Sequence, residues 1–138
     1  MELAMDGPAL EAFVAREFPQ VAGDFAVEAV GEDLVLRLRV ADRHLRPGGT
    51  VSGPNMFALA DVGIYLAILS RLGPVALAVT TNATIDFMRK PAAERDLVAK
   101  VRLLKLGRTL AVGDVLIYSE GETEPVARAS MTYALPKT

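Results

Sequence analysis

One apolar segment interrupted by a single charge constrains this chain more than any other feature. Residues 54–70 read PNMFALADVGIYLAILS, and Asp61 is the only charged residue between Thr50 and Ser70. A carboxylate in apolar surroundings loses hydration, so it must find a partner, become protonated or be kept for chemistry. Asp61 is therefore the first candidate for a functional residue.

The same segment is predicted to form a long helix in the core of the fold. Pro54 suits a first helical turn, Gly73-Pro74 ends the run, and a helix that is apolar on every side is normally buried on every side. A shorter amphipathic helix is expected over 8–18, where Leu10, Phe13 and Val14 recur at helical spacing before Pro19.

Six strands are predicted around these helices. Apolar and polar residues alternate most clearly over 97–104, and Gly-containing turns separate the later strands. The expected ranges are 26–30, 33–40, 76–88, 97–105, 109–119 and 126–134. This order predicts a single α+β domain over 1–138, in which a curled antiparallel sheet wraps a long central helix. Because one sheet covers only part of such a helix, we expect a second subunit and a symmetric dimer.

Composition excludes several classes of function. The chain of 138 residues has no cysteine, which excludes thiol catalysis, disulfides and cysteine metal sites, and its one histidine, His44, cannot define a metal site alone. We expect His44 at the surface or the mouth of a site. With 15 Lys+Arg against 17 Asp+Glu, nucleic acid is not an expected partner. Gly48, Gly49 and Gly53 resemble a phosphate-binding loop, but the Lys and Ser/Thr of a nucleotide P-loop are missing, so nucleotide hydrolysis is not expected.

The chain is also expected to be cytoplasmic and free of the membrane. It begins with the acidic sequence MELAMDGP, which does not resemble a signal peptide, and the apolar run at 54–70 is short and interrupted by Asp61.

Two segments resemble a known family. Residues 49–61 (GTVSGPNMFALAD) and 79–91 (VTTNATIDFMRKP) are similar in layout to the hotdog-fold acyl-CoA thioesterases of the phenylacetate-pathway type. The resemblance runs from about Val40 to Tyr133, and its most specific part is the spacing from the glycine-rich loop to the helix-borne carboxylate. It implies a hotdog fold and hydrolysis of an acyl-CoA, with coenzyme A as part of the substrate and no separate cofactor. It also implies a homo-oligomer, either a dimer or a homotetramer formed as a dimer of dimers.

The resemblance assigns roles to individual residues. Asp61 falls on the family's catalytic carboxylate, where it would act as general base or nucleophile, and Gly53 on the glycine whose N–H polarises the thioester carbonyl. Thr80 or Thr81 falls near the hydroxyl that positions water. A structural alternative stays open, because a buried carboxylate can also serve only as a hydrogen-bond acceptor for a neighbouring strand, and the polar run at 80–84 also fits an edge strand.

The loop before the helix departs from the family pattern. The family's histidine is Ser52 here, its asparagine is about Arg46 and its second glycine is Pro54. Ser52 can still donate a hydrogen bond to a carbonyl, but no nucleophile-elbow sequence surrounds it, so an N-cap or loop role is the simpler interpretation. These departures motivate the alternative function, a non-catalytic hotdog module that binds an acyl-CoA or a related ligand. A dehydratase of the same fold is a third hypothesis.

Four further residues are candidates for substrate binding. Asn55 follows the loop in the first helical turn. Arg89, Lys90 and Arg108 sit in predicted turns, where solvated charges are the ordinary interpretation, and the resemblance adds contact with the phosphates of coenzyme A.

Overall fold

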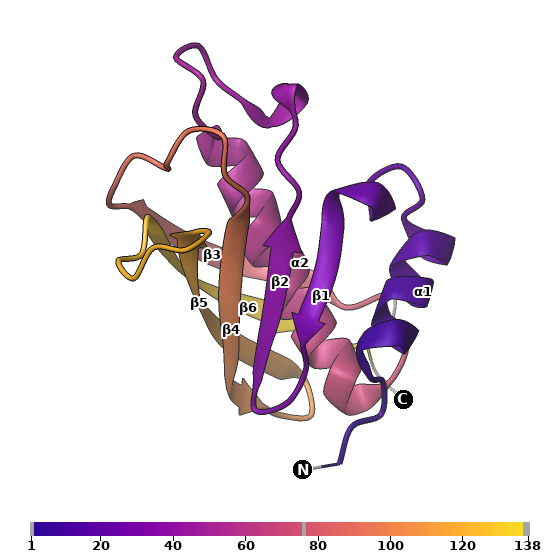
Figure 1. The fold of residues 1–138 in the computed structure, drawn as a ribbon. Helices are drawn as coiled ribbons and strands as arrows, with labels where there is room; N and C mark the ends of the chain where they lie inside the picture. Colours follow the sequence, from indigo (N-terminus) through magenta and orange to yellow (C-terminus); the bar gives the residue numbers. More distant parts are fainter. Residues whose placement is uncertain (1, 76, 137–138) are drawn as a thin grey trace.

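The computed structural model describes residues 2–75 and 77–136, which form one sheet wrapped around a long helix (Figure 1). The helices are α1 (Gly7–Glu17), α2 (Gly53–Leu72) and the short 3₁₀ helices η1 (Ala22–Asp24) and η2 (Asp42–His44). The strands are β1 (Phe25–Ala29), β2 (Asp33–Leu38), β3 (Val79–Phe87), β4 (Leu97–Leu106), β5 (Leu110–Ser119) and β6 (Ala127–Ala134). The predicted helices and strands are all present, with ends within three residues. Ala76, the first residue of the predicted third strand, lies outside the described residues.

The sheet is antiparallel throughout, with the order β1-β2-β4-β5-β6-β3. Strand β3 therefore pairs with β6 at the far edge and not with β2, which precedes it in the chain. Helix α2 connects these distant positions by crossing the inner face of the curled sheet (Figure 1). The predicted α+β class and the wrapped central helix are confirmed.

The core lies between α2 and the inner face of the sheet. Alternate residues of the central strands are buried there, as the sequence alternation predicts. Gly63 brings the helix close, because a Cβ at this position would lie 2.8 Å from a Val101 methyl carbon on β4. Any larger residue at position 63 would force α2 or the Val101 side chain to shift.

One side of α2 is less well covered. Phe57 is 37% exposed, and Ala58, Asp61 and Val62 are half-buried on the same side, although the helix is apolar all round. By length and composition α2 would also meet the criterion for a membrane span, but 61% of its most apolar window is buried inside the structure. Core helices of folded domains meet the same criterion.

The two edges of the sheet differ. The first strand, β1, is five residues long and packs against α1, whereas β3 is nine residues long and mostly exposed. Large apolar side chains are exposed at both ends of β3: Leu77, Val79, Phe87 and Met88. A long, exposed edge with apolar ends is the kind of edge that folded proteins usually cover or pair.

Candidate functional site

The carboxylate of Asp61 receives hydrogen bonds from two hydroxyl groups. Thr80 Oγ1 donates to Asp61 Oδ1 at 2.6 Å, and the Tyr133 hydroxyl lies 2.7 Å from the same oxygen and 3.0 Å from the Asp61 carbonyl oxygen. Within the described part of the chain, Oδ2 of Asp61 has no hydrogen-bond donor. One carboxylate oxygen is therefore held in place while the other can accept a proton or a hydrogen bond.

The sheet places both hydroxyls opposite α2. Thr80 on β3 and Tyr133 on β6 are directly paired across the two strands, and a β-bulge follows, because the next pair is Asn82 with Thr132. Thr81 is the extra residue, and it is exposed and donates to the Thr132 carbonyl oxygen at 3.3 Å. Of the two threonines predicted near the site, the structure brings Thr80 to Asp61 and leaves Thr81 outside.

Sequence reasoning did not identify Tyr133. Its side chain is 3% exposed, and it alternates with the buried Met131, Ala129 and Ala127 along β6. Burial raises the pKa of the Tyr133 phenol, and the hydrogen bond to the Asp61 carboxylate raises it further, so Tyr133 remains a neutral donor. One sequence feature could have identified it: a buried tyrosine hydroxyl needs a polar partner, and Asp61 was the one charge predicted in the core without a partner.

A pocket of about 380 Å³ opens beside Asp61. Its lining residues come from α1, α2, the start of β3 and β6: Val14, Phe18, Asp61, Val62, Tyr65, Ala78, Val79, Thr80 and Tyr133. An apolar cavity with a few convergent polar groups is the usual form of a small-molecule site.

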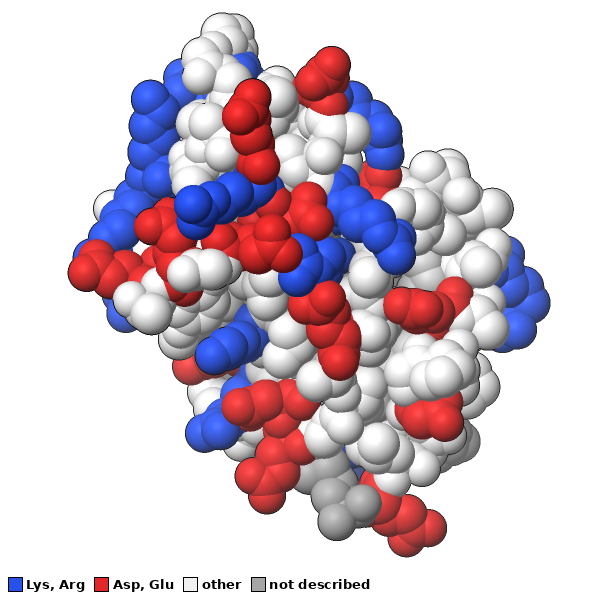
Figure 2. Space-filling view, in the orientation of Figure 1, with Lys and Arg blue, Asp and Glu red and all other residues white. Residues whose placement is uncertain are grey.

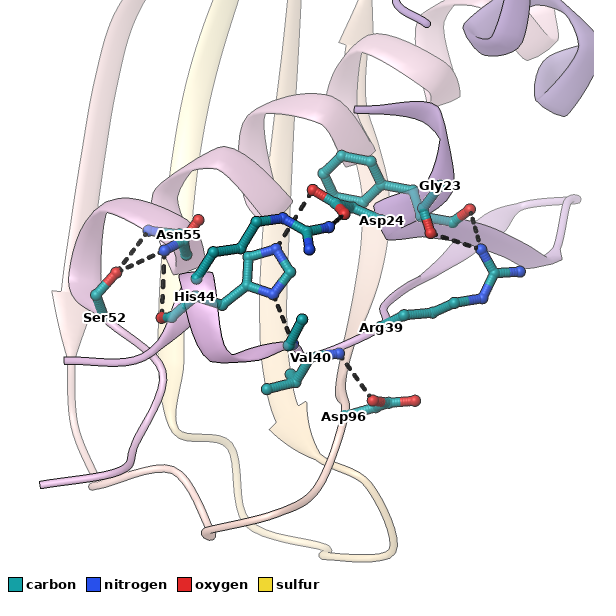
Figure 3. A network of polar contacts seen from close by, with 11 residues as sticks. Gly23, Asp24, Arg39, Val40, His44, Ser52, Asn55 and Asp96 are labelled. Atoms are coloured by element: carbon teal, nitrogen blue, oxygen red, sulfur yellow. Dashed lines mark hydrogen bonds and ion pairs between the residues drawn. The ribbon is translucent and has the colours of Figure 1, made fainter. Parts of the chain in front are cut away.

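Ser52 caps the start of α2. Its Oγ accepts hydrogen bonds from the backbone N–H of Asn55 at 3.4 Å and from Asn55 Nδ2 at 2.8 Å (Figure 3). Asn55 Nδ2 also donates to the His44 carbonyl oxygen at 3.2 Å, and Ser52 N donates to the same oxygen at 2.9 Å. The N-cap role predicted for Ser52 is confirmed. Asn55, predicted as a substrate-binding residue, ties the helix start to the preceding loop.

The prediction that His44 lies at the surface or a site mouth is wrong, because its side chain is 3% exposed. Nδ1 accepts a hydrogen bond from Ala41 N at 2.8 Å, so the proton of the neutral ring is on Nε2, which lies 3.3 Å from Asp24 Oδ2 (Figure 3). Burial lowers the pKa of His44, and the charge of Arg43 lowers it further. Asp24, which also pairs with Arg43, makes the burial of this ring tolerable.

Gly53 is the first residue of α2, so the helix itself does not use its N–H. The ring of Phe87 packs over it, since a Cβ on Gly53 would lie 3.2 Å from Phe87 Cζ. Gly53 and Asp61 are eight residues apart on one helix, which separates them by about 12 Å along its axis. In one chain, the structure does not bring these two predicted catalytic residues to a common point.

The three predicted phosphate contacts are exposed and lie at opposite ends of the sheet. Arg89 follows β3 and bonds to Glu124 at 2.8 Å and to the Pro125 carbonyl oxygen at 2.8 Å, and Lys90 is its neighbour. Arg108 lies in the β4–β5 turn, at the end of the sheet where β3 begins.

The surface carries both signs of charge. Acidic and basic side chains are interspersed over the face shown in Figure 2, in keeping with the net charge of −2. Among residues 2–75 and 77–136, no three His, Asp or Glu side chains are grouped as a metal site would require.

Comparisons with known proteins agree with one another. Residues 48–126 match the family model described as the thioesterase superfamily. The chain is 32% identical over 112 residues to a "putative esterase" of Pseudomonas aeruginosa, covering 81% of this chain and 82% of that protein.

Two solved structures extend the similarity to three dimensions. A "putative thioesterase" of a Silicibacter species is 58% identical, with a TM-score of 0.92, covering 99% of this chain and 95% of that one. A mutant of the phenylacetic acid degradation protein PaaI of Thermus thermophilus is 28% identical, with a TM-score of 0.71, covering 84% of this chain and 97% of that one.

The family match spans the glycine-rich loop, α2 and strands β3 to β5, and so includes Gly53, Asp61 and Thr80. The six-stranded antiparallel sheet curled around α2 is the hotdog fold that the sequence resemblance implies. This chain belongs to the thioesterase superfamily, as a hotdog-fold member similar to the phenylacetate-pathway type.

Proposed function

We propose that this protein hydrolyses an acyl-CoA thioester and that Asp61 activates the attacking water. The observation that carries the proposal is the Asp61 carboxylate at an apolar pocket, with Oδ1 held by Thr80 and Tyr133 and Oδ2 left for another partner. The two hydroxyl donors hold the carboxylate in one orientation, as a general base requires. Membership of the thioesterase superfamily supports thioester hydrolysis as the class of reaction.

The proposed reaction has two steps. As the water oxygen bonds to the carbonyl carbon, Asp61 takes one water proton and the carbonyl π electrons move to the carbonyl oxygen. The resulting oxyanion is stabilised by the N–H of Gly53, at the positive end of α2. When the intermediate collapses, the C–S bond breaks and the leaving thiolate takes the proton from Asp61. The products are the carboxylic acid and coenzyme A.

A complete site in this proposal needs two copies of the chain. Because Gly53 and Asp61 are about 12 Å apart along one helix, a single thioester carbonyl cannot contact both in the same copy. The exposed edge of β3 offers a route: two β3 strands pairing antiparallel about a two-fold axis would extend the sheet and bring the start of one α2 toward Asp61 of the other. The exposed Phe57 and Phe87 would then be covered.

The same pairing of β3 strands would bring the proposed phosphate-binding residues of two copies together. Arg89 and Lys90 lie beyond the end of β3, and Arg108 lies beside its start. In an antiparallel pair of β3 strands the end of one strand meets the start of the other. Arg89 and Lys90 of one copy would then lie near Arg108 of the second copy, where they are proposed to bind the phosphates of coenzyme A.

The test is hydrolysis of short, medium, long and aromatic acyl-CoAs by the purified protein, with Asp61→Asn in parallel. We expect the variant to fold and to lose about a hundredfold or more in turnover, the scale of general acid–base catalysis. Unchanged turnover would remove Asp61 from the mechanism.

Shared sites are tested by mixing two inactive variants. Gly53→Pro removes the N–H at a first-turn position that tolerates proline, while Gly53→Ala keeps the N–H and controls for the added carbon against Phe87. When Gly53→Pro and Asp61→Asn chains are dissociated and reassociated together, we expect about a quarter of wild-type activity, since half of the dimers carry one intact site. No recovery would contradict a site built from two copies.

A second candidate function is binding without hydrolysis. Ser52 stands where the family pattern has a histidine, and its hydroxyl is occupied by Asn55 in the helix cap. If the acyl-CoAs bind with micromolar affinity and none is hydrolysed, the protein is a ligand-binding module on the same fold.

A further inference from the structure

The pocket beside Asp61 has a polar end and an apolar end. Its polar atoms gather where Thr80 and Tyr133 meet the Asp61 carboxylate. The remaining lining residues are apolar or aromatic, and three of them, Val14, Phe18 and Ala78, belong to α1 or to the segments next to α1 and β3. A ligand in this pocket would therefore have its reacting group at one end and an uncharged group at the other.

Three aromatic rings mark the direction of the pocket. Tyr65 lies one helical turn beyond Asp61 on α2, and its ring centre is 6.2 Å from that of Tyr133. The Phe18 ring meets Tyr65 edge-on, with centres 5.9 Å apart and planes at 86°. These ring contacts lead from Tyr133, which is hydrogen-bonded to the carboxylate, through Tyr65 on α2 to Phe18 after α1.

The backbone fixes the position of Phe18. It is the C-terminal cap of α1, its N–H donates to the Val14 carbonyl oxygen at 2.8 Å, and Pro19 follows it. Its φ of −134° and ψ of 56° turn the chain away from the helix at this residue. A proline cannot continue the helix, so the ring is held against Tyr65 by the way α1 ends.

We propose that this pocket takes the acyl group, that it selects compact uncharged acyl groups, and that Phe18 sets the limit on their length. This inference rests on the proposed thioesterase function. A volume of about 380 Å³ is near the lower end of the range of small-molecule pockets, roughly 300–1,000 Å³, and suits an acyl group alone. A long straight chain would have to displace Phe18 from Tyr65.

The charge of the pocket lining also favours uncharged acyl groups. No Lys, Arg or His is among the described lining residues, and the one charged residue there, Asp61, is a carboxylate. An acyl group with a second carboxylate would therefore lose its hydration without gaining a partner. Diacid thioesters are expected to be poor substrates, whatever their length.

The experiment compares kcat/KM for straight-chain acyl-CoAs of increasing length in the wild type, Phe18→Ala and Arg16→Ala. Arg16 is on the same helix and exposed, with its guanidinium over the Phe13 ring, so it serves as the matched control. In Phe18→Ala we expect the ratio of long-chain to short-chain kcat/KM to rise at least about tenfold, the discrimination available from a few methylenes in an apolar pocket. Arg16→Ala should leave the ratio unchanged. An equal loss for all lengths in Phe18→Ala would overturn the inference.

A second variant is expected to change the length profile in the opposite direction, and it does not remove packing. Val62→Phe adds a ring to the half-buried wall of the pocket on α2 and should reduce kcat/KM for long chains before short ones. If neither variant changes the length profile, the acyl group lies elsewhere.

Binding separates failure of this inference from failure of the proposed function. S-alkyl-CoA thioethers have no carbonyl and cannot be hydrolysed, so their Kd reports binding alone, and the change in Kd with alkyl length reports the pocket. If no thioester is hydrolysed but thioether affinity depends on chain length and shifts in Phe18→Ala, the pocket assignment stands and the hydrolase proposal fails. If hydrolysis occurs and thioether affinity is indifferent to Phe18, the pocket assignment fails.

Discussion

The hydroxyl of Tyr133 lies 2.7 Å from Oδ1 of Asp61 and 3.0 Å from the carbonyl oxygen of the same residue. One side chain of β6 thus contacts both the backbone and the carboxylate of a residue in the middle of α2. Thr80 approaches Oδ1 from the neighbouring strand. The side chain that we propose as the base is held by the sheet, and its orientation does not depend on the loop that precedes the helix.

Tyr133→Phe removes this hydroxyl and keeps the ring. Hydrogen bonds to charged groups contribute about 1.5–3 kcal/mol, so we expect turnover to fall about tenfold because the carboxylate is no longer held from β6. Measuring turnover and the melting temperature of the variant together checks this. A tyrosine with only a packing role would lower the melting temperature and leave turnover unchanged below it.

Thr80→Val keeps the shape of the side chain and removes the second donor. Turnover should fall about tenfold, because Oδ1 of Asp61 keeps only the Tyr133 hydroxyl. Thr81→Val is the matched control, since Thr81 is the next residue but contacts only the Thr132 carbonyl oxygen among the hydrogen bonds described. Equal losses in the two variants would show that the strand tolerates valine poorly and that Thr80 has no special role.

His44 should make stability depend on pH near neutrality. Its pKa is lowered in the folded protein by burial, while in the unfolded chain it is about 6.5. Between these values the unfolded chain binds more protons, so stability falls as pH drops below about 6.5, with a limiting slope of about 1.4 kcal/mol per pH unit. Denaturant unfolding at a series of pH values measures this slope.

His44→Asn is the control for that slope. The asparagine carbonyl oxygen can accept the Ala41 N–H in place of Nδ1, but it does not titrate. We expect a variant that is less stable at neutral pH by about 1–2 kcal/mol and shows a flatter profile between about pH 5.5 and 7.5. A slope that persists in this variant would show that His44 is not its source.

Ala83→Asp tests the proposed pairing of β3 edges. Ala83 is exposed in the middle of β3, where a two-fold axis would place two copies of the same residue close together. Two like charges across an antiparallel pair are destabilising, so the variant should sediment at half the mass of the wild type. Ala93→Asp, in the exposed loop before β4, should sediment like the wild type. A dimer in both variants would place the interface away from this edge.

Local patterns in the sequence predicted most of the fold. The apolar run predicted α2, and period-two alternation predicted the strands, because both signals depend on neighbours within one element. The pairing of Thr80 with Tyr133 could not be predicted from local patterns, since it requires β3 to join the sheet beside β6, which lies far along the chain. Asp61 was found because its charge contrasts with its surroundings, whereas Tyr133 resembles any other inward-facing strand residue.

The burial of His44 could likewise not be predicted from its neighbours in the sequence. The nearby Arg43 and Arg46 suggest a solvent-exposed loop, and the charge of Arg43 does lower the pKa of the ring. The partner that accompanies its burial, Asp24, lies twenty residues earlier, in η1. Burial of a polar ring depends on such distant partners, which periodicity does not reveal.

The close contact of Gly63 with Val101 has a consequence for how relatives of this protein can diverge. With no space between α2 and β4, the wall that carries Asp61 cannot move without repacking the core. The lining residues Val14 and Phe18, in contrast, come from α1 and its C-terminal cap, and α1 is a short helix outside the sheet joined to it by residues 18–24. Changes in substrate range should therefore accumulate in and just after α1, while the reacting centre stays the same.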